Sequence, residues 1–172
     1  MRPQMAKRFL NGFALGMVFA LGVFCCGGEK PKVFASLNQT ASIMGELPAN
    51  PLAWRVITSS ANRNDSTMST LYGNDVAIQY ARTNSDHQYP NGSALSLVTW
   101  MQQEDGRWFG AKIPAIVKSV EFVLVSSAAD GHLSYSYQKF EGTPLKKSSA
   151  EEYQVPADRA AELLSQRAAV MP

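Results

Sequence analysis

Two residues of this chain carry an imidazole, the side chain that most often binds metals or moves protons near neutral pH. His87 lies in a polar stretch before a turn, and His132 follows Asp130-Gly131 at the start of a strand-like run. Their spacing matches no metal-binding pattern, and the ordinary interpretation of each is a solvated loop histidine. We predict no metal site and keep His132 as the only weak candidate for an iron ligand.

The signatures of the common catalytic sites are missing from the sequence. It contains no Cys-x-x-Cys-His, no Gly-rich nucleotide loop and no Gly-x-Ser-x-Gly nucleophile turn. The paired acids Glu104-Asp105 and Glu151-Glu152 fall in polar loops, where solvated carboxylates are the ordinary interpretation. We therefore assign no catalytic residue, and the sequence does not favour an enzyme.

The most distinctive segment runs from Arg107 to Pro114. It places two large aromatic residues before a glycine and a cation, and such a set could line a ligand pocket because glycine allows close approach. The alternative is that both rings pack at a core or a sheet edge while the lysine reaches water. With residues of the neighbouring expected strands, the predicted pocket candidates are Leu97, Trp108, Phe109, Lys112, Tyr135 and Tyr137.

Alternating and β-branched runs predict the strands that would position these side chains. The expected strands cover 55–60, 67–72, 93–102, 117–126 and 132–140. A short helix is expected over 75–83 behind an Asn or Asp cap, and an amphipathic helix over 156–171. Strands grouped in the middle, with one helix inserted and one appended, predict an α+β fold on an antiparallel sheet of about five strands.

The first 35 residues have the pattern of an export signal or membrane anchor. Arg2, Lys7 and Arg8 precede an uncharged stretch over 9–26. As a helix this stretch would be about 27 Å long, slightly short of a bilayer core, which favours a cleaved signal peptide over an uncleaved anchor. Because the basic end stays in the cytoplasm, we expect the remainder in the periplasm or otherwise outside the cytoplasm.

Two positions suit cleavage of this segment, after Ala35 and after Gly28. A lipoprotein form, acylated at Cys25 or Cys26, is the alternative, although the bulky Phe24 before them is unfavourable. The expected organisation is a signal peptide or anchor over 1–35, a linker over 36–50 and a single domain over 51–172.

Removing the leader changes the composition of the rest. After residue 35 the chain has 11 basic and 13 acidic residues, and both cysteines have been lost with the leader. The remaining domain has no basic excess to suit nucleic acid, and membrane association is expected only through the N-terminal segment. With no disulfide or thiolate, it must be stabilised by its core.

The order of the expected elements resembles the cytochrome P460 family over about residues 47 to 140. The similarity lies in Leu47-Pro48-Ala49-Asn50-Pro51-Leu52-Ala53-Trp54 before the strand pair, in Leu71-Tyr72-Gly73-Asn74 before a helix, and in Tyr89-Pro90-Asn91-Gly92 before a strand. The resemblance implies a periplasmic α+β domain, often dimeric, that holds c-type haem. Typical members oxidise hydroxylamine or bind small gases such as nitric oxide.

The chain departs from that pattern twice. The haem-attachment motif of the family lies beyond the last strand, where this sequence has Ser148-Ser149-Ala150-Glu151-Glu152-Tyr153 and then a helix. The lysine that cross-links to haem in the P460 enzymes would fall near Leu97, which has no nucleophile. Without a fixed axial ligand, the surroundings cannot tune iron for redox chemistry.

Three functions remain open, and the first is favoured. It is an exported P460-like domain without covalent haem that acts as a binding or accessory module for an unknown small molecule or protein, with no cofactor. The second is a P460-type oxidoreductase or gas-binding protein with non-covalent haem, for which His132 is the least poor ligand. The third is a structural domain whose C-terminal helix forms a homodimer or partner interface.

Overall fold

The computed structural model of this chain describes residues 38–83, 86, 88–128, 132–148 and 156–169. The described residues belong to one compact unit over 37–172. In chain order its elements are η1 (Gln39–Ala41), η2 (Pro51–Ala53), β1 (Arg55–Asn62), β2 (Thr67–Gly73), α1 (Asp75–Thr83), β3 (Ala94–Glu104), β4 (Lys112–Ser127), β5 (Leu133–Glu141), β6 (Lys146–Lys147) and α2 (Pro156–Ser165).

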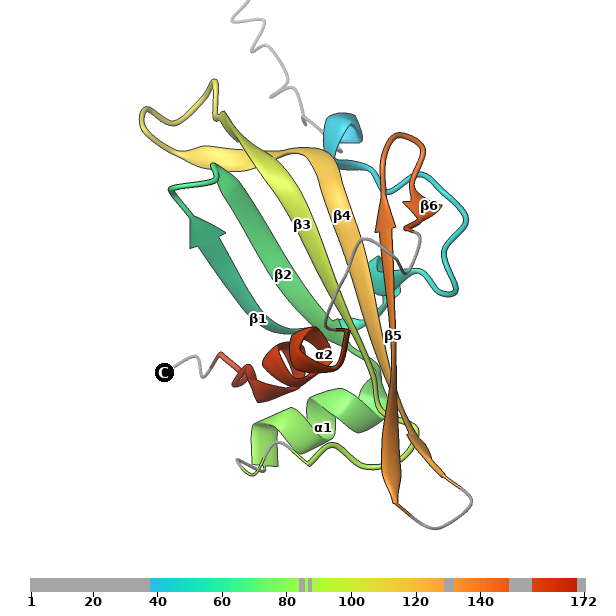
Figure 1. Cartoon of the computed structure of the whole chain (residues 1–172). Coiled ribbons are helices and arrows are strands. Elements are labelled where there is room, and N and C mark those ends of the chain that lie inside the picture. Colours follow the sequence, from blue (N-terminus) through green and yellow to red (C-terminus); the bar gives the residue numbers. More distant parts are fainter. Residues whose placement is uncertain (1–37, 84–85, 87, 129–131, 149–155, 170–172) are drawn as a thin grey trace, which may run out of the picture. The chain divides into compact units, whose positions relative to one another are not determined.

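Each strand pairs antiparallel with the next one in the chain, so the sheet order is β1-β2-β3-β4-β5-β6 (Figure 1). This confirms the predicted α+β fold with an inserted and a C-terminal helix. Strand β6 is not predicted by the sequence, because two residues are too few to show a period. The predicted strand over 117–126 corresponds to β4, which starts earlier, at Lys112.

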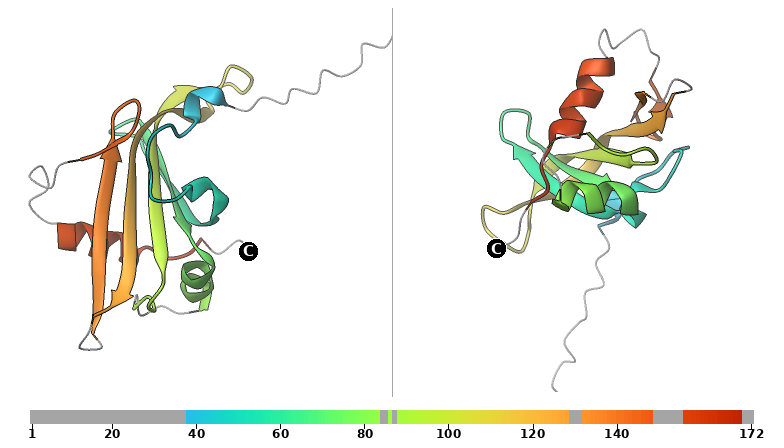
Figure 2. Two further views of the ribbon diagram at one scale, coloured as in Figure 1. Left: turned by 90° about the vertical axis from the view of Figure 1, so that its right-hand side faces the viewer. Right: turned by 90° about the horizontal axis from the view of Figure 1, so that it is seen from below.

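The two faces of the sheet carry separate apolar clusters. On one face α1 and α2 cover the sheet, as Figures 1 and 2 show. That cluster includes Leu71, Leu95, Leu97, Val123 and Val125 of the strands with Ala77, Ile78, Ala160, Leu163 and Leu164 of the helices. On the other face Val98, Trp100, Val120, Phe122 and Phe140 are buried beneath the segment before β1.

That N-terminal segment, expected as a linker, packs on the sheet from residue 38 onward. Ala41, Ile43, Leu47 and Ala49 lie against the second cluster, and Trp100 Nε1 donates to the Ala41 carbonyl at 3.0 Å. Gly45 forms a parallel bridge with Leu145, and a Cβ at position 45 would lie 2.5 Å from the Leu145 carbonyl oxygen. Only glycine fits this crossing without displacing backbone.

Asn74 explains why α1 begins where the sequence predicts. Its side-chain oxygen accepts from the Ala77 amide at 3.0 Å, which caps the helix, and from the Ala94 amide at 3.2 Å. Its amide nitrogen donates to the Gly92 carbonyl at 2.8 Å. One asparagine therefore joins the helix start to the expected Asn-Gly turn, where Gly92 has a φ of 85°.

The C-terminal helix is shorter than the predicted span over 156–171. It ends at Ser165, and residues 166–169 continue without helical structure. The Ala169 amide donates instead to the Ile57 carbonyl of β1 at 2.8 Å. The free edge of β1 thus offers the backbone after Ser165 a hydrogen bond that competes with continuation of the helix. The helical period of the sequence does not reveal this competing partner.

Candidate functional site

The helix-covered face of the sheet changes from apolar to polar along the strands. Three rows of cross-strand neighbours show the change, since paired residues lie on one face. The first is Leu95, Val123 and Tyr137, the second is Leu71, Leu97, Glu121 and Lys139, and the third is Ser69, Thr99, Ser119 and Glu141. Because α2 covers the apolar rows, the polar row lies beside the helix.

Glu121 lies at this boundary and is 4% exposed. Arg159 of α2 donates to both of its oxygens, from Nε to Oε2 at 2.8 Å and from Nη2 to Oε1 at 2.9 Å. Tyr137 of β5 donates its hydroxyl to Oε2 at 2.7 Å. A bidentate guanidinium and a phenol together satisfy a carboxylate that could not otherwise be buried.

These contacts set the protonation states. Burial alone would raise the pKa of Glu121, but the hydrogen bonds from Arg159 and Tyr137 outweigh it and hold the pKa below its usual value. Burial and the bond to Glu121 raise the pKa of Tyr137 well above its usual range. At neutral pH the cluster therefore contains a carboxylate, a guanidinium and a neutral phenol. Because the pKa of Tyr137 is raised, its phenol does not ionise to a phenolate that could act as a base.

A second ion pair continues the polar row at the sheet edge. Lys139 Nζ lies 2.6 Å from Glu141 Oε1, and the Ser148 hydroxyl donates to Glu141 Oε2 at 3.0 Å. Lys139 is also the cross-strand neighbour of Glu121, and its positive charge helps to lower the pKa of the Glu121 carboxyl. Two carboxylates and two cations thus alternate across β4, β5 and α2.

A polar cavity of about 390 Å³ opens above this network. Its volume is within the range of small-molecule sites. Among the residues that the structure describes, Leu97 is the one apolar residue that lines it. The other lining residues carry charged groups (Asp65, Lys118, Glu121, Lys139, Glu141, Arg159 and Glu162) or hydroxyls and amides (Ser60, Asn62, Thr67, Ser69, Thr99, Ser119 and Gln166).

Four carboxylates and three cations line the polar cavity, and two of these groups, Asp65 and Lys118, form no ion pair within the described residues. Arg159 is held by Glu121 and, through Nη1 at 2.6 Å, by Glu162, and Lys139 is held by Glu141. Lys118 is exposed and forms no ion pair within the part of the chain that the structure describes. It is therefore the lining cation best able to meet a negatively charged ligand.

The structure separates the residues that the sequence suggested as one pocket. Leu97 lines the polar cavity, and Tyr137 binds Glu121 beneath it. Trp108 and Phe109 lie exposed in the β3–β4 hairpin, beyond Glu104 at the end of β3, which is seven residues or roughly 23 Å along the strand from Leu97. Lys112, at the base of that hairpin, pairs with Glu104.

Tyr135 and His132 lie towards the other end of β5. Tyr135 is 48% exposed, and His132 is an exposed residue beside the first residue of the strand. The His132 carbonyl accepts from the Ala128 amide at 2.8 Å and closes the β4–β5 hairpin. Neither residue lines the polar cavity, and His87 lies outside the described residues.

Sequence reasoning missed Glu121 and Arg159 as site residues. Glu121 was seen only as one member of an alternating strand, although it is the single charge in the otherwise apolar run over 120–125. A lone carboxylate in a strand covered on both faces requires a partner, and this was the available signal. Its partner is 38 residues away, so no local pattern could identify Arg159.

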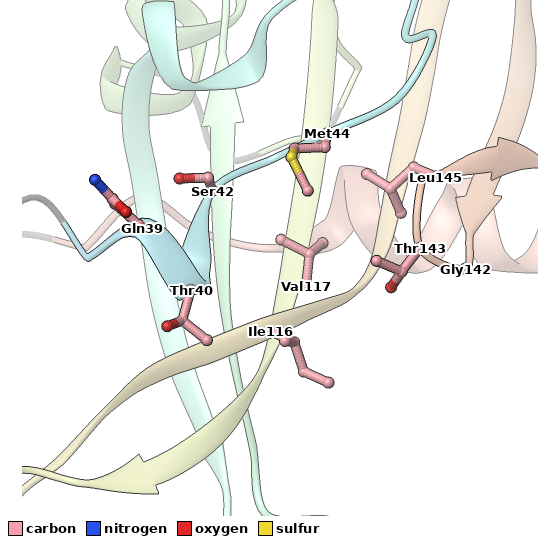
Figure 3. Close-up of a pocket in the computed structure, with 9 residues that line it drawn as sticks. All are labelled: Gln39, Thr40, Ser42, Met44, Ile116, Val117, Gly142, Thr143 and Leu145. Carbon is pink, nitrogen blue, oxygen red and sulfur yellow. The ribbon is translucent and has the colours of Figure 1, made fainter.

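A second hollow, of about 230 Å³, lies on the opposite face (Figure 3). Met44, Ile116, Val117 and Leu145 provide its apolar wall, and none of its lining residues is charged. Figure 3 shows Met44, Val117 and Leu145 near one another where the N-terminal segment crosses β4, with Ile116 pointing away from them. Its polar lining side chains are the uncharged Gln39, Thr40, Ser42 and Thr143. With no charged group to orient a ligand, it is less suited to specific binding than the polar cavity.

Comparison with known proteins identifies the fold. The family model for cytochrome P460 matches residues 48–158. The chain belongs to the cytochrome P460 family. No curated protein sequence matches the chain. The family match includes the whole sheet, Glu121 and the start of α2, but it ends one residue before Arg159, so Arg159, Glu162 and Gln166 of the polar cavity lie beyond it.

Haem is the cofactor that membership of this family implies, and the lining of the polar cavity does not fit it. Proteins hold haem iron with imidazole, thiolate, thioether or phenolate groups, and none of the described residues that line the cavity has such a group. The flat apolar macrocycle would also meet a wall of charges. Leu97, at the position implied for the cross-linking lysine, is 5% exposed and belongs to the cluster that α2 covers.

Among the described residues, no three His, Cys, Asp or Glu side chains are grouped so as to hold a metal ion. In the same part of the chain, no helix is long and apolar enough to cross a membrane.

Proposed function

We propose that this P460 domain is an exported binding module that holds a small hydrophilic molecule in the polar cavity and does not use haem. The observation that supports it is the placement of a fully hydrogen-bonded Glu121–Arg159–Tyr137 cluster at the wall of a cavity of suitable volume. Such a cluster is rigid because each partner fixes the others. A rigid polar wall is what selective binding of a polar ligand requires.

The lining carries four carboxylates and three cations, so it favours a ligand with several hydroxyl groups that meet Asp65 and the neutral polar residues, and a single anionic group that meets Lys118. Lys118 supplies a charge that is not neutralised within the described residues. Seven lining residues carry hydroxyls or amides that can donate or accept hydrogen bonds. The expected class is therefore a small carboxylate, such as a hydroxy acid or a sugar acid.

The haem question is tested first, by the absorbance spectrum of the protein after export. We expect no Soret band, and none after hemin is added and excess hemin is removed. A stable Soret band would overturn this part of the proposal and would support the alternative of a P460-type protein with non-covalent haem.

Ligand binding is tested by calorimetry with citrate, tartrate, gluconate and neutral glucose. We expect at least one of the carboxylates to bind and glucose not to bind. Lys118→Ala should weaken binding at least about tenfold, equivalent to about 1.4 kcal/mol, whereas Lys118→Arg should retain it. Arg82→Ala, which removes an exposed cation of α1, is the matched control. Equal affinity of the Lys118→Ala and Arg82→Ala variants would contradict the assignment.

Export and assembly belong to the same proposal. A C-terminal alkaline phosphatase fusion should be active, because this reporter folds only in an oxidising compartment. A homodimer remains a prediction, which size-exclusion chromatography with light scattering would test.

A further inference from the structure

The β3–β4 hairpin presents two large aromatic side chains to solvent. The last paired residues of the two strands are Glu104 and Lys112. In the turn beyond them, Trp108 is 70% exposed and Phe109 is 110% exposed. Single exposed apolar residues are ordinary, but two adjacent rings at the tip of a projecting hairpin are not. Figures 1 and 2 show the tip extending away from the rest of the sheet.

The turn that carries the rings is held by its own hydrogen bonds. The Asp105 amide donates to the Ala111 carbonyl at 3.0 Å, and the Ala111 amide donates to the Trp108 carbonyl at 3.0 Å. The Asp105 carboxylate accepts from the Arg107 amide at 2.8 Å. Gly110 has a φ of 75°, which closes the turn at a position that suits glycine. The exposure of the rings is therefore a property of an ordered turn.

The hairpin has no net charge to direct it towards a charged partner. Glu104 pairs with Lys112 across its base, and Asp105 and Arg107 contribute one charge of each sign. Its contribution to binding must come from apolar and aromatic surface. Trp and Phe are the residues that amphipathic elements use to enter the boundary between lipid headgroups and acyl chains.

The chain enters the domain beside this hairpin. The first described residue, Asn38, donates its side-chain amide to the Pro114 carbonyl of β4. Pro114 is two residues beyond Lys112, at the base of the hairpin. Figure 1 and the left view of Figure 2 both show η1 and the hairpin at the same end of the sheet. The uncharged stretch over 9–26 ends 12 residues before Asn38, a span of at most about 40 Å.

We propose that the tip of the β3–β4 hairpin inserts Trp108 and Phe109 into the surface of a lipid bilayer. The bilayer is chosen over a protein partner because a leader that is retained as an anchor, or acylated at Cys25 or Cys26, ties the chain ahead of Asn38 to the membrane, and Asn38 lies at the base of the hairpin. The inference relies on the proposed export of the domain with its leader still attached, but not on the polar cavity. It gives the folded domain a membrane contact of its own, and with it a fixed orientation on the bilayer.

Tryptophan fluorescence of the full chain in phosphatidylcholine vesicles tests this contact. The chain has three tryptophans, and Trp100 is buried while Trp54 is partly buried. Vesicles whose lipids are brominated near the headgroup should quench Trp108, and vesicles brominated near the chain end should quench it less. Trp108→Phe should abolish the difference between the two lipids. Phe109→Ser should reduce the quenching of Trp108, because the tip would insert less deeply.

The outcomes distinguish the membrane from other occupants. Absence of headgroup-level quenching, or equal quenching in the Trp108→Phe variant, would overturn the proposal. A blue shift that depends on protein concentration without vesicles would indicate a second copy at the tip and would also overturn it. Lys118→Ala should leave the quenching unchanged, so failure of the polar-cavity proposal would be seen separately.

Discussion

Arg159 of α2 holds both oxygens of the Glu121 carboxylate on β4, at 2.8 and 2.9 Å. The pair joins the C-terminal helix to the centre of the sheet at the point where the sheet face changes from apolar to polar. Leu97 is the cross-strand neighbour of Glu121 and belongs to the same apolar cluster as Leu163 and Leu164 of α2. The helix is therefore fixed by a buried ion pair on one side and by core packing on the other.

Removing Arg159 should destabilise the fold. Arg159→Met leaves a carboxylate that is 5% exposed without its cation, at an expected cost of about 2 to 3 kcal/mol in the free energy of unfolding. The cost stays below that of a wholly buried pair because the Arg159 side chain is 33% exposed. Urea denaturation measures it.

The exposed Arg167 provides the control, since Arg167→Ala should change the free energy by less than about 0.5 kcal/mol. In a double-mutant cycle, Glu121→Gln with Arg159→Met should show a coupling energy of about 1 to 3 kcal/mol. A coupling near zero would mean that the pair does not act as a unit.

Acid should remove the contribution of Glu121. Its pKa in the folded protein lies below the value of about 4.3 expected in the unfolded chain. The stabilisation is therefore complete above about pH 5 and is lost as pH falls through the folded pKa, because the unfolded state then binds the proton more readily. Urea midpoints between pH 3 and pH 7 should fall more steeply on the acid side for the wild type than for Glu121→Gln. Parallel profiles would show that another carboxyl governs acid stability.

Leu97 should behave as a core residue although it also lines the polar cavity. Leu97→Ala is expected to cost about 2 to 5 kcal/mol, since its neighbours in the α2-covered cluster cannot fully fill the space. Leu52→Ala, at a residue that is 47% exposed, should cost less than about 0.5 kcal/mol. Similar stability of the two variants in thermal denaturation would indicate that α2 does not pack on this row.

Gly45 should not tolerate a side chain. In Gly45→Ala the new Cβ would meet the Leu145 carbonyl oxygen at 2.5 Å, and the backbone φ of 153° adds strain. We expect a loss of about 1 to 3 kcal/mol, measured by thermal unfolding, as the N-terminal segment shifts from the sheet. Gly106→Ala is the matched control, because a Cβ there has no atom within 4 Å. Equal melting temperatures would show that the crossing can adjust at little cost.

The sequence by itself determined the elements and their order. The alternation of Val120, Phe122 and Leu124 against Glu121, Val123 and Val125 fixes which residues share a face, since the side-chain period of a strand is two. Asn74 and Gly92 similarly mark where α1 begins and where β3 is about to start. These signals depend on neighbours in the chain, and the resemblance to the P460 family depended on the same local motifs.

The tertiary structure alone decided the site and the role of the aromatic segment. Glu121 and Arg159 are 38 residues apart, and they meet only because α2 folds back over the sheet, which no period can predict. Trp108 and Phe109 were expected beside Leu97, but β4 begins at Lys112, so the hairpin carries them away from the sheet face. A local pattern predicts which side of a strand a residue occupies. What covers that side is determined by distant packing, because burial is shared among segments remote in the sequence.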